Sequence, residues 1–229
     1  MNAAKTNGVP KRDDIKIRVA IVDDHPVVRF GLIQLIADEP DLAVCGQAAN
    51  AQEAIELAQA VKPNVMVIDI SLRDGNGIEL IKQIRALDGS IRLVVHSMYD
   101  ESLFAERAIL AGAMGYVNMQ ETTDNLITAI RRVLKGEVYL SPNMTNKMLQ
   151  GISRGGGKPV APVLSTLSDR ELEIFGMIGD GLTIRQIAAK LHLSPKTIET
   201  HRARMRKKLD IHSNPELIRR ASQWKLEQG

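Results

Sequence analysis

Between residues 16 and 135, short apolar runs alternate with stretches whose apolar positions recur at helical spacing. Several of the runs are apolar throughout, as in strands that are covered on both faces. Five strand and helix units in succession predict a doubly wound α/β fold around a parallel five-stranded sheet. The predicted strands span residues 17–22, 42–46, 65–70, 91–97 and 115–118, and the predicted helices span 27–38, 51–61, 78–87, 102–111 and 122–135.

Beyond residue 165 the pattern is that of helices alone. Capping side chains mark the starts of four short helices, two as capping boxes and two just before a proline at the first helical position. The second and third helices are separated only by the sequence HLS, a helix-turn-helix connection. We therefore predict an all-α, four-helix helix-turn-helix domain. The capping residues are Ser168 with Glu171, Thr183 with Gln186, Ser194 and Asn214.

The segment GISRGGGKPVAPVLS, residues 151–165, separates the two patterns. It contains three consecutive glycines and two prolines and has no apolar periodicity. Such a composition is typical of a flexible linker between domains. We therefore predict a flexible leader, a sheet domain, a linker with a helical start and a helix-turn-helix domain, at residues 1–15, 16–140, 141–164 and 165–229.

Charge divides along the chain in the same way. Residues 1–140 contain 15 Lys and Arg against 19 Asp and Glu, whereas residues 165–229 contain 12 against 8. An acidic first part and a basic last part indicate a different partner for each. The basic part is a candidate for binding nucleic acid.

The composition bounds the class of protein. Hydrophobic residues make up 44% of the chain, enough for real cores. No run approaches 18 consecutive apolar residues, and the start, MNAAKTNGVPKRDD, lacks the apolar segment of a secretory signal. We therefore expect a soluble, cytoplasmic protein without a membrane partner. The single cysteine, Cys45, excludes an intrachain disulfide and disfavours a cysteine-based metal site.

Polar side chains stand where the predicted strands end. Asp23 and Asp24 follow the first strand, Asp69 lies near the end of the third, Ser97 ends the fourth and Met119 follows the fifth. The carboxyl ends of parallel strands share one edge of the sheet, where ligands gather. Three carboxylates at that edge repel one another unless a proton or a cation shares the site, and a hard divalent ion fits best. The pattern predicts a Mg²⁺-dependent phosphoryl-transfer site with Asp69 as the nucleophile.

Single polar residues at strand ends are common, so it is their joint placement that indicates a site. His25, His96 and His212 are scattered and lack companions at the spacing of metal ligands, which predicts structural roles. The sequence RDGNG, residues 73–77, lacks the lysine and threonine of a phosphate-binding P-loop. We interpret it as a turn before a helix.

The segment SPKTIETHRARMRKKLDI, residues 194–211, carries six Lys or Arg and one Glu between 194 and 208. On a helix that starts at Pro195, one stripe is apolar and faces a small core. The opposite face is narrow and polar, as a helix in the DNA major groove requires. A run of charge alone is usually a solvated surface, but the capped helix and tight turn before it favour DNA binding. The apolar stripe is Ile198, Met205 and Leu209, and the polar face is Lys196, Glu199, Thr200, Ala203 and Lys207.

Four motifs, IVDDHPVVRFGL, VIDISLRDGNGIEL, HSMYDE and AGAMGYV, resemble in order and spacing the flavodoxin-like receiver domain of bacterial two-component response regulators. The resemblance covers about residues 16–135. It implies a phosphoacceptor that a partner histidine kinase modifies, a Mg²⁺ site and two residues that respond to the phosphoryl group. The implied phosphoacceptor is Asp69. The implied Mg²⁺ ligands are Asp24 directly, Asp23 more loosely, Asp69 itself and the backbone carbonyl of Ser71. Ser97 would donate to the phosphoryl oxygens, and Tyr116 would turn inward afterwards.

Two positions depart from the receiver pattern. Arg73 replaces a common proline, which changes only the loop, and Met119 replaces the lysine that contacts the phosphoryl group. One charge-assisted hydrogen bond worth about 1.5–3 kcal/mol is therefore absent. We hypothesise that Asp69 is still phosphorylated but that phosphorylation is poorly converted into a conformational change. The alternative is that the Met119 side chain packs there and a neighbouring cation compensates.

The segment LSDRELEIFGMIGDGLTIRQIAAKLHLSPKTIETHRARMRKKLDI closely resembles the LuxR-type helix-turn-helix, with a match over residues 165–226. Together with the receiver, it is typical of the NarL/FixJ class of response regulators. The resemblance implies binding of duplex DNA at an inverted repeat by a homodimer that forms through the last helix. The implied phosphate contacts are Lys196, Thr197, Arg202, Lys207 and Lys208, and the implied base-reading positions are Glu199, Thr200 and Ala203.

These resemblances predict a DNA-binding transcription regulator, not an enzyme, that is controlled by phosphorylation of Asp69. Met119 leaves open a regulator that works without phosphorylation. A Mg²⁺-dependent phosphohydrolase with Asp69 as nucleophile is a further alternative. It is disfavoured because Ser71, and not a second acid, stands two residues after Asp69.

Overall fold

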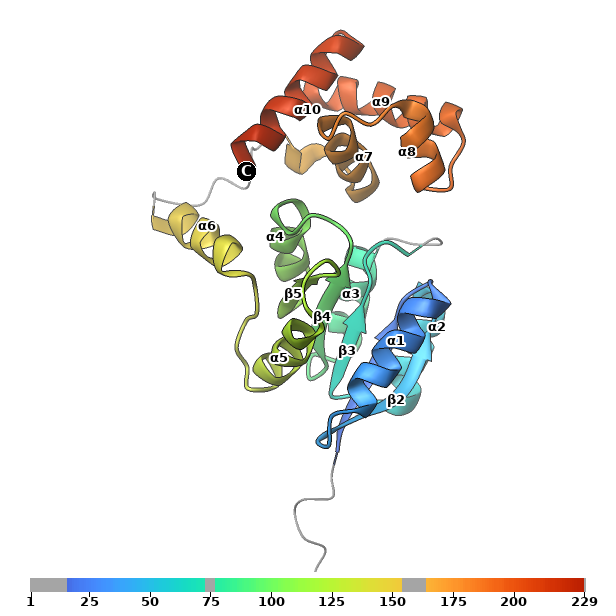
Figure 1. Ribbon diagram of the computed structural model, residues 1–229, viewed down its shortest axis with the longest axis vertical. Coiled ribbons are helices and arrows are strands. Elements are labelled where there is room, and N and C mark those ends of the chain that lie inside the picture. Colours follow the sequence, from blue (N-terminus) through green and yellow to red (C-terminus); the bar gives the residue numbers. More distant parts are fainter. Residues whose placement is uncertain (1–15, 73–76, 154–163, 229) are drawn as a thin grey trace, which may run out of the picture. The chain divides into compact units, whose positions relative to one another are not determined.

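The computed structural model describes the chain outside its first residues and two internal segments (Figure 1). The described residues are 16–72, 77–153 and 164–228. The predicted leader and the Gly/Pro-rich part of the predicted linker therefore lie outside them. The chain forms two compact units, here called the sheet unit and the helical unit. The sheet unit is Met1–Ser97 with Ala111–Tyr139, and the helical unit is Met98–Leu110 with Leu140–Gly229.

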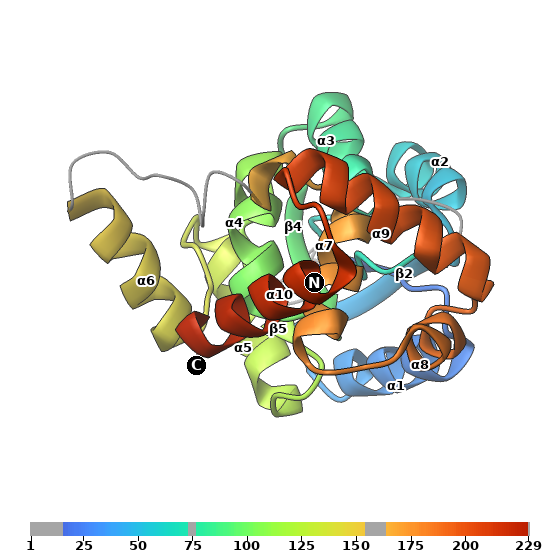
Figure 2. The same ribbon diagram turned by 90° about the horizontal axis from the view of Figure 1, so that it is seen from above.

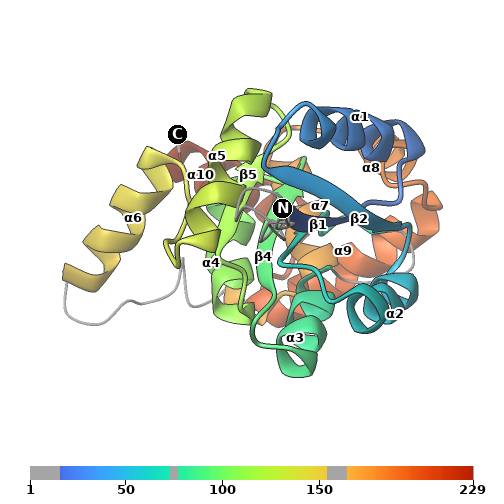
Figure 3. The same ribbon diagram turned by 90° about the horizontal axis from the view of Figure 1, so that it is seen from below.

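The sheet unit contains the parallel five-stranded sheet that the apolar runs predict. The strands lie in the order β2-β1-β3-β4-β5. Helices α1 and α5 cover one face of the sheet, and α2 and α3 cover the other (Figure 3). This confirms the predicted fold class. The strands are β1 (Ile17–Val22), β2 (Leu42–Ala48), β3 (Val65–Ile68), β4 (Arg92–Ser97) and β5 (Gly115–Asn118), and the helices of this unit include α1 (Pro26–Ala37), α2 (Ala51–Val61), α3 (Gly77–Leu87) and α5 (Thr123–Leu134).

Burial on both faces explains the unbroken apolar runs. Val65 to Ile68 of β3, the central strand, are all buried. On one face, Ile36 of α1 and Ile130 of α5 belong to the same core cluster as Val67. Each such side chain stabilises the fold by about 1.5–3 kcal/mol when it leaves water. The strands therefore form a firm support for the polar residues that follow them.

The helical unit has the predicted arrangement of short capped helices. Helix α7 packs against α9 and α10, and α8 packs against α9 (Figure 2). Ser168 and Thr183 form capping boxes, and Ser194 caps α9 ahead of Pro195, as predicted. The helices are α4 (Glu101–Ala111), α6 (Pro142–Ser153), α7 (Asp169–Gly179), α8 (Ile184–Lys190), α9 (Pro195–Leu209) and α10 (Asn214–Gln228), with a 3₁₀ turn at Leu164–Thr166.

The start of the last helix differs from the sequence-based expectation. The predicted cap of the last helix, Asn214, is wrong by one residue, because Asn214 is already helical. The Ser213 hydroxyl accepts from the N–H of Glu216 at 3.3 Å and so does what a capping side chain does. Residues Met98–Leu110 group with the helical unit, whereas residue 140 was the predicted boundary. The predicted domain boundaries stay a prediction.

Candidate functional site

The strand register brings two predicted site residues to the same edge of the sheet. Strands β1 and β3 pair in parallel with Val22 beside Ile68. The backbone N–H of Asp69 donates to the carbonyl oxygen of Val22 at 2.8 Å. Asp23 and Asp69 therefore leave neighbouring strands at the same level.

Both strands end because an aspartate side chain turns the backbone. The Asp23 Oδ1 atom accepts from the N–H of His25 at 2.7 Å, and the Asp69 Oδ1 atom accepts from the N–H of Ser71 at 2.9 Å. Such a bond to the amide two residues on defines an Asx turn. The turn at Asp69 explains why β3 stops at Ile68, two residues before the predicted end. The same side chains that form the site thus shape the loops around it.

Asp23, Asp24, His25 and Asp69 form a cluster, here called the acidic cluster. Each of the four offers one ligand atom, and these atoms all lie within 4.8 Å of one another. His25, for which we expected a structural role, belongs to this group. Its Nδ1 atom lies 2.8 Å from Asp24 Oδ1 and 3.3 Å from Asp23 Oδ1. The sequence signal for His25 was its position directly after the two aspartates.

The electrostatics of the acidic cluster favour a cation. Burial raises the pKa of Asp23 to about 6, although the hydrogen bond from the His25 N–H opposes the shift. Burial also raises the pKa of Asp69. In the described part of the chain, the buried Asp23 Oδ2 atom has no hydrogen-bond partner. A buried carboxylate oxygen without a donor is costly, and a divalent ion with hard oxygen ligands would satisfy it. The residues therefore fit a divalent cation.

Two hydroxyl groups and a backbone amide hold the carboxylate of Asp69. The hydroxyl of Ser97, which is fully buried, donates to Asp69 Oδ1 at 2.8 Å. The Ser71 hydroxyl donates to Asp69 Oδ2 at 2.5 Å. The N–H of Met119 donates to the carbonyl oxygen of Ser97 at 2.9 Å, so Met119 follows β5 at the level of Ser97. Tyr116 is buried in β5 beside Val95 of β4.

A cationic side chain, that of Arg29, lies at the edge of the acidic cluster. Its Nη1 atom donates to the backbone carbonyl of Asp23 at 2.6 Å, and its Nε atom donates to Gln47 Oε1 at 3.2 Å. These bonds direct the guanidinium toward neutral oxygens. The half-buried Met119 contributes a thioether, which cannot donate a hydrogen bond.

Helix α9 presents the two faces that its sequence predicts. Pro195 occupies its first position, and the Ser194 hydroxyl accepts from the N–H of Thr197 at 3.0 Å. The predicted apolar stripe is buried, so the opposite face is turned to solvent. The buried residues are Ile198, Met205 and Leu209, and the exposed ones include Lys196, Glu199, Thr200, Ala203 and Lys207.

The side chains of the remaining predicted DNA contacts have partners within the helical unit or are partly buried. The Thr197 hydroxyl lies 2.8 Å from that of Ser194, and Arg202 is half-buried. The Lys208 Nζ atom lies 2.6 Å from Glu171 Oε2, and the Glu171 side chain is only 3% exposed. Burial would raise the pKa of Glu171, but the bonds from Lys208 and Ser168 outweigh it and lower the pKa. Lys208 therefore ties α9 to the start of α7.

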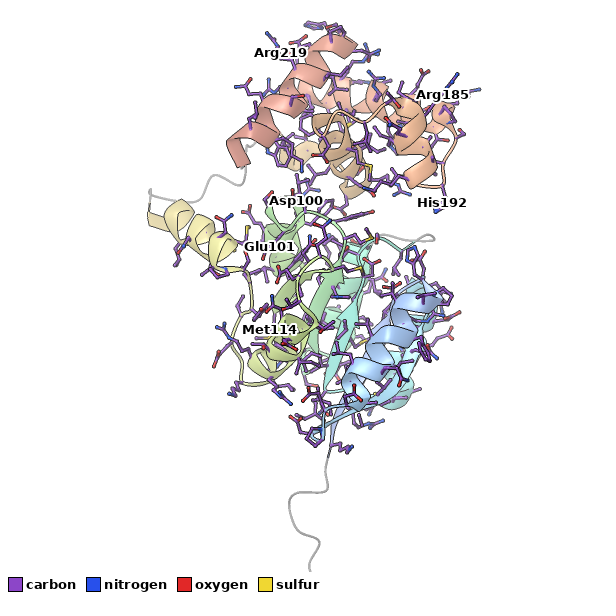
Figure 4. The ribbon with its side chains drawn as sticks, viewed as in Figure 1. Asp100, Glu101, Met114, Arg185, His192 and Arg219 are labelled. Atoms are coloured by element: carbon purple, nitrogen blue, oxygen red, sulfur yellow. The ribbon has the colours of Figure 1, made fainter. Side chains whose placement is uncertain are left out.

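Several basic residues of the helical unit were not predicted as site residues. Arg204 is exposed on α9 one turn after Thr200, and its i+4 spacing could have identified it. Arg185 on α8 and His192 in the turn before α9 are exposed, as is Arg219 on α10 (Figure 4). His192 has a φ of 53°, the left-handed conformation that a tight turn requires. These side chains add positive or titratable groups to the surface of the helical unit.

Known proteins share both parts of this arrangement. Residues 19–131 match the response regulator receiver domain, and residues 165–221 match the bacterial regulatory proteins of the luxR family. The transcriptional regulatory protein UhpA of Escherichia coli is 35% identical over 204 residues, which are 89% of this chain and 97% of UhpA. The chain belongs to this family of response regulators.

Other members of the family are similar to this chain along most of its length. The DNA-binding transcriptional activator DevR/DosR of Mycobacterium tuberculosis is 36% identical over 195 residues, covering 85% of this chain and 89% of that protein. RcsB from Salmonella enterica serovar Typhimurium, solved bound to promoter rprA in the presence of the phosphomimetic BeF₃⁻, is similar with a TM-score of 0.58. That match has 25% identity and covers 91% of this chain and 99% of the other.

This response regulator thus combines a receiver with a LuxR-type DNA-binding domain and is a regulator of transcription. The predicted family and general function are confirmed. In the described residues, no helix combines the length and the apolar character needed to span a membrane.

Proposed function

We propose that a sensor histidine kinase phosphorylates this response regulator on Asp69 and that phosphorylation controls DNA binding by α9. An oxygen of the Asp69 carboxylate attacks the phosphorus, a P–O bond forms, and the P–N bond to the kinase histidine breaks with its electron pair left on the imidazole. The observation that carries the proposal is the position of Asp69 inside the acidic cluster, where its carboxylate is buried and oriented by two serines.

Mg²⁺ is the cation that these ligands suit best. Asp24 directly, Asp23 more loosely, Asp69 and the backbone carbonyl of Ser71 would hold it. When bound, it would neutralise negative charge on the phosphoryl oxygens. Ser97 would donate to those oxygens. Tyr116, which is buried in β5, would be held in its inward position once the phosphoryl group is bound.

On the DNA side, the exposed face of α9 supports contact with the major groove. Glu199, Thr200 and Ala203 would face the bases. Lys208 would bind a phosphate and also pairs with Glu171. The full set of proposed phosphate contacts is Lys196, Thr197, Arg202, Lys207 and Lys208. A homodimer through α10 would require an inverted-repeat site.

The two alternatives are less well supported. A regulator that works without phosphorylation does not need a buried nucleophile beside metal ligands. This chain has both, since Asp69 lies beside Asp23, Asp24 and His25. A phosphohydrolase is disfavoured because the relatives over most of the chain are transcription regulators. We therefore retain phosphorylation-controlled DNA binding as the proposed function.

The direct test compares the native chain with Asp69→Asn. Acetyl phosphate and Mg²⁺ are expected to label the native protein, as a shifted band on a phosphate-affinity gel, and to leave Asp69→Asn unlabelled. Beryllofluoride is expected to tighten the binding of selected duplexes by the native chain alone. Equal labelling of the two proteins, or equal DNA binding by the native chain with and without beryllofluoride, would contradict the proposal.

The faces of α9 give a second prediction. Lys207→Ala is expected to weaken binding to all duplexes by a similar factor, because a phosphate contact carries no sequence information. The slope of log affinity against log salt should fall by about 0.9 for each bound subunit, the value for one released counterion, and so by about 1.8 for a homodimer. Glu199→Ala should instead change the preferred sequence. Fluorescence anisotropy over a salt series with two unrelated duplexes measures both effects.

Lys208→Ala is a comparison for stability alone, since Lys208 is the next residue on α9 but is also a proposed phosphate contact. Its removal leaves the buried Glu171 carboxylate without its cation, so the helical unit is expected to lose about 1–2 kcal/mol of stability. Lys207→Ala should leave stability unchanged because its side chain is exposed. The assignment of faces is wrong if Lys207→Ala alters sequence preference and Glu199→Ala does not.

A further inference from the structure

The two oxygens of the Asp69 carboxylate are held in different ways. Oδ1 accepts from the backbone N–H of Ser71 at 2.9 Å and from the Ser97 hydroxyl at 2.8 Å. Oδ2 accepts from the Ser71 hydroxyl at 2.5 Å. The backbone donor is fixed by the Asx turn, whereas the Ser71 hydroxyl can rotate about its own side-chain bonds. The Ser71 hydroxyl can therefore leave Oδ2 and donate to another oxygen without any movement of the backbone.

Among residues 16–72 and 77–153, the other side chains considered near Asp69 are poorly placed to supply a donor to a phosphoryl group. The Met119 side chain has no N–H or O–H. Arg29 donates to the Asp23 carbonyl and to Gln47, and His25 lies against Asp23 and Asp24. In the part of the chain that the structure describes, the hydroxyls of Ser71 and Ser97 donate to the Asp69 carboxylate.

We propose that the Ser71 hydroxyl is a hydrogen-bond donor for phosphoryl transfer to Asp69 and that it takes over part of the contact a lysine would make at position 119. The inference rests on the proposed function. Before transfer, the hydroxyl orients Oδ2; during transfer, it rotates to donate to an oxygen of the incoming phosphoryl group. This is a contact of the side chain, separate from the backbone carbonyl proposed as a metal ligand.

The step balances without any change at Ser71. With acetyl phosphate as donor, a bond forms between Asp69 Oδ2 and phosphorus, and the bond from phosphorus to the acetate oxygen breaks. Acetate leaves with the electron pair, and the Ser71 O–H bond stays intact. Because the hydroxyl is neutral, it contributes a hydrogen bond but does not cancel the charge that the phosphoryl group brings.

The first experiment measures the initial rate of labelling of the full chain by acetyl phosphate on phosphate-affinity gels. Ser71→Ala removes the hydroxyl and keeps the backbone N–H that bonds Oδ1. We expect about a tenfold lower rate, the effect of one hydrogen bond to a charged group. Ser71→Thr keeps a hydroxyl and should stay within about threefold of the native rate. Far-UV circular dichroism of both variants checks that they are folded.

The second experiment tests substitution for lysine by a double-mutant cycle. Met119→Lys is expected to restore most of the rate lost in Ser71→Ala, but to change the rate of the otherwise native chain by only about twofold. A purely structural role for Ser71 would give no such rescue. The inference is overturned if Ser71→Ala labels at the native rate, or if it slows labelling by the same factor with and without Met119→Lys.

Asp69→Asn separates this inference from the proposed function. Native labelling of Asp69→Asn would remove the basis of both. Loss of labelling in Asp69→Asn together with native labelling of Ser71→Ala would overturn only the role of Ser71. A folded Ser71→Ala that labels slowly and is rescued by Met119→Lys supports both.

Discussion

Gly77→Ala is expected to lower the free energy of unfolding of the sheet unit by about 3 kcal/mol. A Cβ atom at Gly77 would lie 2.3 Å from Ile70 Cα and 2.9 Å from the carbonyl oxygen of Asp69. Both neighbours are backbone atoms directly after β3, so they cannot rotate away as a side chain would. Relief of the clash must displace the segment from Asp69 to Ser71, and with it the bonds that orient the Asp69 carboxylate.

Hydrogen exchange of peptides from β1 and β3, measured by mass spectrometry, reports the stability of the sheet unit separately from the helical unit. Labelling by acetyl phosphate should fall together with the protection of these strands. Gly31→Ala is the matched control, since a Cβ there would meet nothing within 4 Å. It lies inside α1, where alanine is favoured by up to about 1 kcal/mol. Similar losses of protection in the two variants would show that close approach is not the reason for Gly77.

Asp23→Asn is expected to stabilise the sheet unit by about 2–3 kcal/mol at pH 8 without Mg²⁺. Burial raises the pKa of Asp23 from 3.8 to about 6 in the folded protein. Between these two values the folded state binds more protons than the unfolded state, so the native protein loses stability as the pH rises through this window. Asparagine has no charge to lose, and its side-chain oxygen can still accept from the N–H of His25.

The difference in stability between Asp23→Asn and the native chain should therefore be small at pH 4 and reach its full size above pH 6. Saturating Mg²⁺ should reduce the difference at pH 8, because the carboxylate then has a cation to bind. Asp41→Asn is a control of opposite sign. Hydrogen bonds from Arg131 hold the pKa of Asp41 below its usual value, so replacing Asp41 by asparagine should lower stability at high pH. If the native protein and Asp23→Asn were equally stable at both pH 4 and pH 8, the conclusion that the buried Asp23 carboxylate destabilises the folded protein would be wrong.

The fold was predictable because each level of the pattern agrees with the next. A buried strand must be apolar on both faces, and a helix on its surface must be apolar on one, so β1 and α2 were both visible in the sequence at their observed bounds. The end of β3 was less predictable. Ile70 continues the apolar run and is buried, but the bond from the Ser71 N–H to Asp69 ends the strand earlier.

The candidate site was predictable as a set of aspartates and only in part as a set of contacts. Position at the strand ends pointed to Asp23 and Asp69, since the edge of a parallel sheet collects whatever follows its strands. It did not point to the hydroxyl of Ser71, because a serine after an aspartate occurs in many loops. Nor did it point to the ion pair of Lys208 with Glu171, which joins residues 37 positions apart.

The order of residues alone determined that this chain has a parallel sheet followed by a helix-turn-helix, and that carboxylates follow β1 and β3. These properties depend on side-chain periodicity and on caps, which are local in the sequence. Only the tertiary structure decided which atoms meet: His25 with Asp24, Ser71 with Asp69 Oδ2, and Lys208 with Glu171. Such contacts depend on turns and on the packing of separate elements, where a change of one or two ångströms makes or breaks a hydrogen bond.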